Sequence, residues 1–473
     1  MISIPELYSL YRDCSYKVAT DSRTISGGEI FFALKGENFD GNAYAVSALL
    51  KGAAYAVVND DYSFCPDLPS ERLIKVHSPF ETLQELAEYH RLQLDIPVIG
   101  LTGTNGKTTT KELIAAVLRA KFEVCATEGN LNNDIGVPLS LLKMTPATQI
   151  AVIEMGASHP GDINKLVQIS RPTHGFITNV GKAHLQGFAS FEGVKAAKAE
   201  LYHWLGEQEG AVLFLNQDDS VLVEMARKEP CHVFGYGLDY QGVSILPSSA
   251  SDPFMSLLFP SGVTLRTHLV GAYNASNVLA ALAIGEYFGV SRESAFAAVE
   301  KYIPSNQRSQ MQQSGSNTLI IDAYNANPSS MAVALDNLFA MKDGSKYALL
   351  GDMRELGDDS LAEHIAVVKR LTASDVRFYL VGEEFRKALI ACSLPGVKFE
   401  PAIKQPKNGG ETHIEAGSII PVNASIPPDS LFRGWFSVSG DLSLHLGVQP
   451  IEKSLILLKG SRSIEMERVL GTL

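Results

Sequence analysis

The chain contains few cysteines and has no excess of positive charge. Its five cysteines, among 473 residues, are odd in number and form no CxxC pair. This pattern argues against a disulfide framework and indicates reduced, mostly buried thiols in a cytosolic protein. Acidic residues outnumber basic ones, 52 to 40, and give a formal net charge of −12. General nucleic-acid binding needs an extended basic face, so this balance argues against it.

Long apolar runs are also missing. No uncharged apolar stretch approaches the roughly 20 residues that a helix needs to span a bilayer. The N-terminal sequence MISIPELYSLYRDC has no basic region followed by an apolar core and therefore predicts no signal peptide. We expect a soluble cytoplasmic protein. Its 45% apolar and 19% charged residues are typical of globular chains, and its length predicts about two to four domains.

The most informative stretch is residues 96–110. Val98, Ile99 and Leu101 predict a buried parallel strand, and residues 112–118 predict a helix. The turn between them reads Gly103-Thr104-Asn105-Gly106-Lys107-Thr108. Such a turn gathers backbone N–H groups, the positive end of the helix dipole and the Lys107 ammonium around one point.

The Thr108 hydroxyl in this turn suits a Mg²⁺ ion held between phosphates, so the stretch predicts a triphosphate cradle. The spacing is not that of the strict Walker pattern, whose first glycine would fall at Leu101. A glycine- and threonine-rich turn without a ligand is the alternative.

Two later strands end in potential metal ligands. Residues 150–154 form an apolar run that ends in Glu154, and a predicted strand at 176–180 is followed closely by His184. Parallel sheets bind ligands at the carboxyl ends of their strands, so Glu154 and His184 should share a rim with Thr108. Together they could hold divalent cations beside the phosphates. Taken singly, a strand-end Glu or His is more often structural, whereas the nearby phosphate loop favours the metal-binding interpretation.

Several other polar groups have two interpretations. Ser22 and Arg23 could hold a ligand's phosphates or could form an ordinary surface turn, and Asn132 and Asn133 could bind a sugar-like ligand or form an Asx turn. Lys198 lies on a predicted helix with Lys195 three positions earlier, which is the usual pattern of a solvated basic face.

Asn274 stands at the start of the predicted helix 278–287, where it could contact an adenine edge or cap the helix.

The last third of the chain predicts a second doubly wound sheet. Its expected strands are 318–321, 347–350, 378–381 and 454–458. Three of them lead into polar turns, which read DAYNANP, GDMRELG and KGSR. Repetition of strand, polar turn and helix is typical of α/β folds. The polar segment 303–315 has the composition of a hinge between domains.

Taken together, these motifs resemble one family. GTNGKTT, TDSR with ALKGENFDG, GNLNNDIGVP, DAYNANP, GDMRELG and KGSR are similar to motifs of the ATP-dependent Mur ligases of peptidoglycan synthesis. The resemblance runs from Thr20 to about Gly382 and returns at Leu455–Glu467, whereas residues 395–450 fit poorly.

The resemblance implies an α/β protein of three domains: a small α/β UDP-binding domain at 1–82, a central P-loop parallel-sheet ATPase domain at 83–310, and a C-terminal Rossmann-like domain at 311–473 that binds the incoming dipeptide.

The resemblance also implies an activity. It is the ATP-dependent ligation of D-alanyl-D-alanine to UDP-N-acetylmuramoyl-tripeptide, through an acyl phosphate and with Mg²⁺. We expect a monomer, because nothing in the sequence demands a larger assembly. The alternative within this family is another amide ligase, which adds a different amino acid or resembles folylpolyglutamate synthase. Outside the family, the alternatives are a P-loop regulator or transport ATPase and a non-catalytic nucleotide-binding scaffold.

Site residues follow from the same resemblance. It implies ATP contacts at Gly103, Thr104, Asn105, Gly106, Lys107, Thr108, Thr109, Asn274, Arg308 and Asp322. It implies metal ligands at Thr108, Glu154, His184 and a carbamylated Lys198, and UDP-sugar contacts at Ser22, Arg23, Asn132 and Asn133. The groups expected to act in catalysis are Lys107, Lys198, His184 and Arg308.

Overall fold

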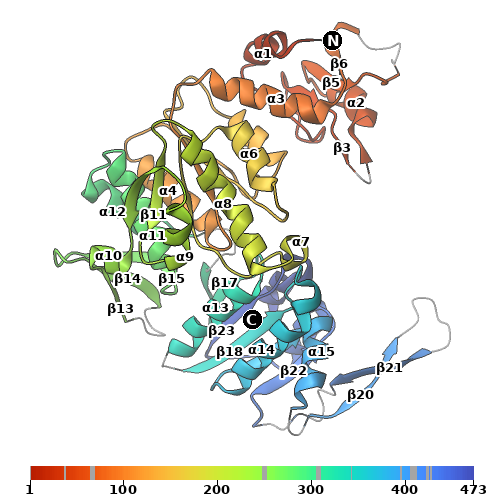
Figure 1. Cartoon of the computed structure of the whole chain (residues 1–473). Coiled ribbons are helices and arrows are strands. Elements are labelled where there is room, and N and C mark those ends of the chain that lie inside the picture. Colours follow the sequence, from red (N-terminus) through yellow and green to blue (C-terminus); the bar gives the residue numbers. More distant parts are fainter. Residues whose placement is uncertain are drawn as a thin grey trace. The chain divides into compact units, whose positions relative to one another are not determined.

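A computed structural model gives the fold. It describes residues 2–36, 39–63, 70–247, 253–304, 310–341, 344–394, 397–404, 413–421, 426 and 429–473. The chain forms two compact units (Figure 1). The first comprises Met1–Val180, Lys195–Tyr240 and Val278–Val299, and the second Gly181–Val194, Gln241–Asn277 and Glu300–Leu473. Within the described part of the chain, the helices are too short or too polar to cross a membrane.

The first unit begins with a small parallel sheet. Its strands are β1 (Val18–Ala19), β2 (Ile30–Phe32), β5 (Tyr55–Asn59) and β6 (Leu73–Val76), in the order β1-β2-β5-β6. The accompanying elements are α1 (Ile4–Asp13), α2 (Ala45–Leu50), α3 (Pro79–Leu92) and the short antiparallel pair β3 (Lys35–Gly36) and β4 (Phe39–Asp40). The side chain of Ser78 accepts a hydrogen bond from Glu81 N and caps α3, whose first residue is Pro79.

A six-stranded parallel sheet forms the rest of the first unit's core. Its strands are β7 (Val98–Thr102), β8 (Val124–Ala126), β9 (Ile150–Glu154), β10 (His174–Ile177), β11 (Val212–Asn216) and β12 (His232–Tyr236), in the order β12-β11-β10-β7-β9-β8. Strand β7 pairs with both β9 and β10, so the carboxyl ends of these three strands lie side by side. A topological switch point of this kind is where open α/β sheets bind ligands.

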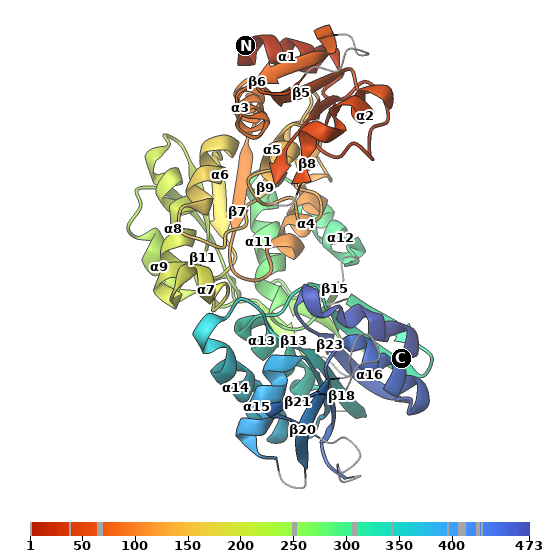
Figure 2. The ribbon, with the colours of Figure 1, turned by 90° about the vertical axis from the view of Figure 1, so that its right-hand side faces the viewer.

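Helices cover both faces of this sheet. The helices of this part of the chain are α4 (Lys107–Leu118), α5 (Gly136–Leu141), α6 (Asp162–Ser170), α8 (Phe191–Glu207), α9 (Ser220–Ala226), α11 (Asn274–Tyr287) and α12 (Arg292–Lys301); α8, α11 and α12 begin or end in the second unit. Figure 2 shows α6 and α8 on one side of β7 and α4 on the other. Every residue of β7 and β9 is buried, as their apolar sequences predict.

The second unit holds another six-stranded sheet. Its strands are β16 (Gln310–Ser314), β17 (Asn317–Asp322), β18 (Ser345–Gly351), β19 (Arg377–Val381), β22 (Phe432–Phe436) and β23 (Ser454–Lys459), in the order β16-β17-β23-β18-β19-β22. All neighbours are parallel except β16, which runs antiparallel to β17. Apolar side chains are buried in two separate clusters, so the sheet is covered on both faces.

The second unit contains further helices and two smaller sheets. Its helices are α7 (Leu185–Phe188), α10 (Leu238–Gln241, shared with the first unit), α13 (Pro328–Ala340), α14 (Ser360–Thr372), α15 (Glu383–Cys392) and α16 (Ser439–Val448). A three-stranded antiparallel sheet contains β13 (Ser244–Leu246), β14 (Phe254–Leu258) and β15 (Thr264–Val270). Strands β20 (Phe399–Lys404) and β21 (His413–Pro421), in the stretch that fits the resemblance poorly, form a separate antiparallel pair.

The predicted α/β class, with parallel sheets that begin at the expected apolar runs, is confirmed. One expected strand, 176–180, ends earlier than predicted: β10 ends at Ile177. Beyond it Thr178 N still donates to Thr102 O, and the side chains of Thr178 and Asn179 bond to Asn105 O in the turn after β7. In the segment predicted as a hinge, Gln310–Ser314 form β16, and residues 305–309 lie outside the described residues.

Candidate nucleotide and metal site

The turn after β7 has the geometry of a phosphate loop. Gly103 has φ +143°, and a Cβ built on it would overlap Oγ1 of Thr178. Gly106, with φ +78°, precedes α4, which starts at Lys107. Both glycines occupy backbone conformations that residues with a side chain rarely adopt. Helix α4 therefore begins directly after the turn, with its first N–H groups at the carboxyl edge of the sheet.

Two residues that follow β10 hold this loop in place. Thr104 N donates to Asn179 O at 3.0 Å, and Asn105 N donates to Asn179 Oδ1 at 3.0 Å. The hydroxyl of Thr178 donates to Asn105 O at 2.7 Å. Sequence reasoning gave Thr178 and Asn179 no such role. The signal that was available is a polar Thr-Asn pair at the end of an apolar strand, which the sheet order places next to β7.

Lys107 lies over its own loop. Its Nζ donates to Gly103 O at 2.8 Å and to Thr104 O at 3.2 Å. Carbonyl oxygens are weaker partners for an ammonium than phosphate oxygens are. A phosphate bound on the loop would therefore attract this ammonium away from the carbonyls.

A buried carboxylate lies beside the loop. Glu154, at the end of β9, is 1% exposed. Its Oε1 accepts hydrogen bonds from Thr108 Oγ1 at 3.2 Å and from Asn132 Nδ2 at 2.8 Å. Its Oε2 is buried as well, and no donor among the described residues reaches it. Burying a charged oxygen without a partner is costly, so a divalent cation is the kind of group that fits here.

Lys198, on α8, is a second buried charge in this region, with 2% exposure. Burial, followed by repulsion from Lys107, lowers the pKa of Lys198 to about 7. A substantial fraction of this side chain is therefore a neutral amine at neutral pH. A neutral amine can react with CO₂ to form a carbamate, whereas an ammonium cannot.

His184 belongs to the second unit, so its place on the rim with Thr108 and Glu154 remains a prediction. It follows residues 181–183, has φ +51°, and its Nδ1 makes an ion-pair contact of 2.5 Å with Oε2 of Glu355. The contact with His184 lowers the pKa of Glu355. Within the described residues, no cluster of three or more His, Cys, Asp or Glu side chains could hold a metal ion. The predicted ligand set does not require one, because it draws on Thr108 and a modified Lys198.

The predicted UDP-sugar contacts lie in the first unit. Arg23 is 85% exposed in its side chain and bonds to Asp21, with 2.7 Å between Nη2 and Oδ2. Ser22 is buried. Asn133 Oδ1 accepts from Ile135 N at 3.4 Å, which is the contact expected of an Asx turn, and from Gly136 N at 2.8 Å. These contacts agree with the structural interpretations of Arg23 and Asn133 and leave their roles in substrate binding as predictions.

Three further predicted residues have different outcomes. Asn274 is buried and engages both ends of its amide, donating to Val270 O at 2.9 Å and accepting from Asn277 Nδ2 at 2.9 Å. Asp322, at the end of β17, pairs with the buried Lys459 at 2.5 Å. Arg308 lies outside the described residues.

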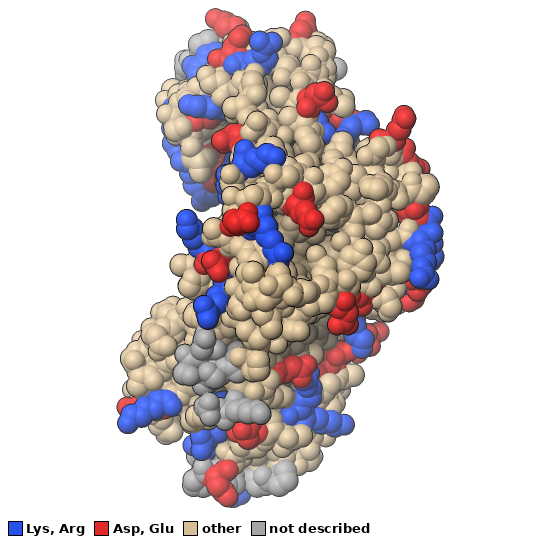
Figure 3. Space-filling view, turned by 90° about the vertical axis from the view of Figure 1, so that its left-hand side faces the viewer, with Lys and Arg blue, Asp and Glu red and all other residues tan. Residues whose placement is uncertain are grey.

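Charge is mixed over the surface. On the face shown in Figure 3, basic and acidic side chains are interspersed over the described residues. No continuous basic surface covers the described part of that face.

Comparison with protein families gives three matches along the chain. They are "Mur ligase family, catalytic domain" at residues 16–91, "Mur ligase middle domain" at residues 101–285 and "Mur ligase, glutamate ligase domain" at residues 307–404. The second match contains the phosphate loop, Glu154 and Lys198.

Individual relatives extend the similarity to nearly the whole chain. The UDP-N-acetylmuramoyl-tripeptide–D-alanyl-D-alanine ligase of Escherichia coli is 32% identical over 96% of this chain and 93% of its own length. The ligase of the same name from Bacillus subtilis is 36% identical over 72% of this chain and 74% of its own length.

Among solved structures, MurF from Acinetobacter baumannii has a TM-score of 0.76 at 28% identity and covers 96% of this chain and 92% of its own. MurF ligase from Thermotoga maritima, solved in complex with ADP, shares the fold with a TM-score of 0.77 at 24% identity, over 97% of both chains.

Proposed function

The chain belongs to the Mur ligase family, and from that premise we propose that it joins D-alanyl-D-alanine to UDP-N-acetylmuramoyl-tripeptide at the expense of ATP, in the synthesis of peptidoglycan precursors. Relatives named for this reaction are similar over nearly the whole chain. The structural observation that carries the proposal is the buried carboxylate of Glu154, which lies beside the phosphate loop with one oxygen unpartnered.

ATP binds with its phosphates on Gly103–Thr109. The glycines allow the backbone to approach the phosphates, the N-terminus of α4 stabilises their negative charge, and Lys107 neutralises part of it. Asn274 contacts the adenine and Asp322 the ribose. Arg308 reaches the γ-phosphate. These three assignments rest on the resemblance of the motifs in which the residues stand.

The donor set at the loop suits Mg²⁺. Thr108 Oγ1 and the free oxygen of Glu154 are hard ligands of the kind that Mg²⁺ prefers, and a carbamate on Lys198 would add two more oxygens. The imidazole of His184 completes the proposed set. When bound, Mg²⁺ neutralises the charge that builds up on the transferred phosphoryl group.

The reaction has two steps. A terminal carboxylate oxygen of the tripeptide attacks the γ-phosphorus of ATP, which forms an acyl phosphate and releases ADP. The amine of D-alanyl-D-alanine then attacks the acyl carbon, loses a proton, and the C–O bond to phosphate breaks. Lys107 and Arg308 hold the phosphoryl oxygens during the first step. No side chain acts as a nucleophile.

The three predicted regions divide this work. Residues 1–82 bind the UDP part of the substrate, with Ser22 and Arg23. Residues 83–310 bind ATP and place Asn132 and Asn133 toward the UDP-sugar. Residues 311–473 bind the incoming dipeptide. The enzyme works as a monomer in the cytoplasm, where its nucleotide substrates are made.

Phosphate release from ATP, measured with the UDP-linked tripeptide, tests this function. Release should require D-alanyl-D-alanine, and one amide bond should form for each phosphate. Single amino acids offered in place of the dipeptide should give much lower rates, which separates this activity from that of other amide ligases in the family. Steady release without any amine would instead indicate an ATPase and would contradict the proposal.

A further inference from the structure

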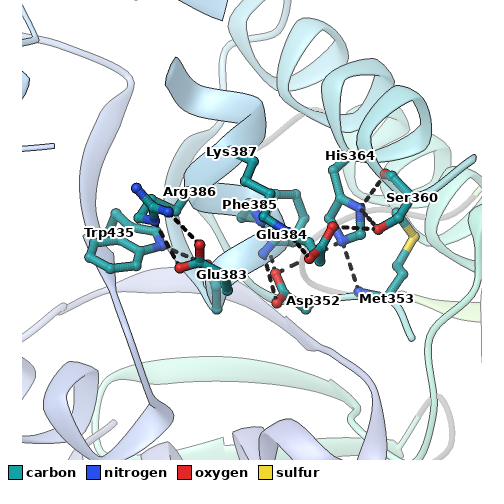
Figure 4. A network of polar contacts seen from close by, with 11 residues as sticks. Asp352, Met353, Ser360, His364, Glu383, Glu384, Phe385, Arg386, Lys387 and Trp435 are labelled. Carbon is teal, nitrogen blue, oxygen red and sulfur yellow. Dashed lines mark hydrogen bonds and ion pairs between the residues drawn. The ribbon is translucent and has the colours of Figure 1, made fainter. Parts of the chain in front are cut away.

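The GDMRELG turn, Gly351–Gly357, is anchored unusually firmly. Asp352 is fully buried, and both of its carboxylate oxygens accept backbone hydrogen bonds at the start of α15: Oδ2 from Glu384 N at 3.0 Å and Oδ1 from Phe385 N at 2.9 Å (Figure 4). Gly382 must lack a side chain here, because a Cβ would overlap this carboxylate. The start of the turn is therefore fixed to the neighbouring strand-to-helix connection.

The next two residues are fixed as well. Met353 N donates to Nε2 of His364 at 3.0 Å, and Nδ1 of that ring donates to Ser360 O at 2.7 Å (Figure 4). Arg354 N donates to Ser461 Oγ at 2.9 Å. The Asp352 carboxylate and the backbone N–H groups of Met353 and Arg354 are all hydrogen-bonded, which leaves the turn little freedom. The next residue, Glu355, therefore projects from a rigid base.

Glu355 contacts the segment that carries His184. Its Oε2 lies 2.5 Å from His184 Nδ1, and its carbonyl accepts from Gln186 N at 3.2 Å. Glu355 and His184 both have left-handed backbones, with φ +64° for Glu355 and φ +51° for His184. Such conformations cost free energy in residues with a side chain and persist where surrounding contacts enforce them, often at functional sites.

Other contacts hold the same segment before and after His184 in the sequence. Before it, Lys182 pairs with Glu363 at 2.7 Å, and Lys182 N donates to Ser329 Oγ at 2.9 Å. After it, the ring of Phe188 meets the imidazole edge-on, with 6.4 Å between centroids. The segment is thus held by the second unit, and Glu355 is the residue that contacts a nitrogen of the His184 ring.

We propose that Glu355 is a positioning residue for His184: its carboxylate, 2.5 Å from Nδ1, favours a proton on that nitrogen and thereby keeps Nε2 unprotonated and available to a divalent cation. Which nitrogen of a histidine is free is set by the hydrogen bond that the other nitrogen makes. Carboxylates that orient metal-binding histidines in this way affect metal affinity as well as activity. The inference rests on the proposed role of His184 as a metal ligand.

The tautomer of His184 is the first test. We would record ¹⁵N imidazole spectra of the full-length protein at pH 8 and assign His184 by the signal that His184→Gln removes. Wild type should show protonated Nδ1 and unprotonated Nε2. Glu355→Ala should shift His184 toward the Nε2–H tautomer, and Glu355→Gln, whose amide oxygen still accepts, should retain much of the wild-type pattern.

Glu363→Ala is the matched control. It removes a carboxylate that is ion-paired to the same segment but does not contact the imidazole. It should leave the tautomer unchanged. An unchanged His184 signal in Glu355→Ala, or an equal shift in both alanine variants, would overturn the proposal.

Metal affinity is the second test, with Mn²⁺ as the probe and a non-hydrolysable ATP analogue present, followed by electron paramagnetic resonance. Glu355→Ala should weaken Mn²⁺ binding by about tenfold and Glu363→Ala should not. The effect of Glu355→Ala should disappear when His184 is already alanine, since the two residues act through one ligand. Equal effects in both backgrounds would overturn the proposal.

The two proposals fail differently. If His184→Ala leaves Mn²⁺ affinity unchanged, the assignment of His184 as a ligand is wrong, whatever Glu355 does. If His184→Ala weakens binding and Glu355→Ala does not, the ligand assignment stands and the positioning role of Glu355 is wrong.

Discussion

Two buried carboxylates, one from each six-stranded sheet, have opposite surroundings. Glu154 and Asp352 both follow apolar parallel strands and are 1% and 0% exposed. Both oxygens of Asp352 accept backbone hydrogen bonds, whereas Oε2 of Glu154 has no donor among the described residues. Burial alone therefore does not identify a binding site. An unsatisfied buried oxygen next to a phosphate loop favours one, because no described residue compensates its charge.

The difference indicates that the two similar sheets have different roles, one in ligand binding and one in supporting a rigid turn. Around Glu154 the chain provides glycines, a helix N-terminus and a lysine, all suited to a ligand that the protein must receive. Around Asp352 the polar groups satisfy one another, which gives a rigid base for Glu355. Substitutions at the first site should impair chemistry more than stability, and those at the second should do the reverse.

The largest contrast is expected between Glu154→Gln and Asp352→Asn. Glu154→Gln removes the charge offered to the cation, and ligation should fall by about 10³-fold with little change in Tm. Asp352→Asn places an amide NH₂ against backbone donors and should destabilise the protein by about 2 kcal/mol. Initial rates and thermal unfolding measure the two effects. Equal losses of Tm in both variants would remove the distinction between the two carboxylates.

A second contrast concerns two glycines that face side chains. Gly103→Ala forces a Cβ onto Thr178 and should weaken nucleotide binding by about 100-fold, measured by titration with ATP. Gly382→Ala forces a Cβ onto Asp352 and should lower Tm while leaving ATP affinity nearly unchanged. Gly210→Ala is the control for backbone strain, since its φ is +73° and a Cβ there meets no atom within 4 Å. A loss of ATP affinity in the control as large as in Gly103→Ala would implicate strain rather than the loop.

The pKa of Lys198, lowered to about 7 by burial, predicts a pH dependence at the first site. Carbamate formation needs the neutral amine, whose fraction grows as pH rises through 7. Activity in limiting bicarbonate should therefore rise by about tenfold from pH 6 to pH 8. Lys198→Ala should be inactive and partly rescued by a short added carboxylate.

Lys195→Ala serves as the control on the same helix, because Lys195 pairs with Glu224 at 3.1 Å and is not assigned to the site. It should retain the pH dependence. Bicarbonate-independent activity in the wild type would contradict a carbamate at Lys198.

The smallest expected effect concerns acid stability at the second site. Burial lowers the pKa of His364, whose neutral ring accepts from Met353 N. The unfolded state therefore binds this proton first, and the stabilisation is lost as pH falls from about 6.5 through the lower folded pKa. Urea unfolding at pH 7 and pH 5 should differ by about 1 kcal/mol more in wild type than in His364→Leu. An equal difference in the two proteins would contradict this.

Local patterns predicted the elements and the loop. Apolar runs at 98–101 and 150–154 marked buried strands, and glycines with Lys107 marked the phosphate loop, because each signal is contained in a few neighbouring residues. The partners of these groups were harder to predict. The contact of Asn132 with Glu154, which lies 22 positions later, was not predicted, and the role of Asn132 toward the sugar stays a prediction.

The least predictable contacts join distant segments. Asp352 bonds to Glu384 N, 32 positions later, and Glu355 meets His184 from another part of the chain. Such pairings depend on the strand order and on the direction in which each polar turn projects. Local residue spacing encodes neither of these. The GDMRELG motif was visible in the sequence, whereas its role as a rigid base required the structure.

The fate of the substrate carboxylate oxygens tests the proposed chemistry most directly. UDP-N-acetylmuramoyl-tripeptide labelled with ¹⁸O in its terminal carboxylate would be ligated to D-alanyl-D-alanine with ATP, and the products would be analysed by mass spectrometry. An acyl phosphate predicts that one ¹⁸O atom passes to inorganic phosphate and one stays in the new amide in every turnover. Unlabelled phosphate alongside amide formation would contradict it.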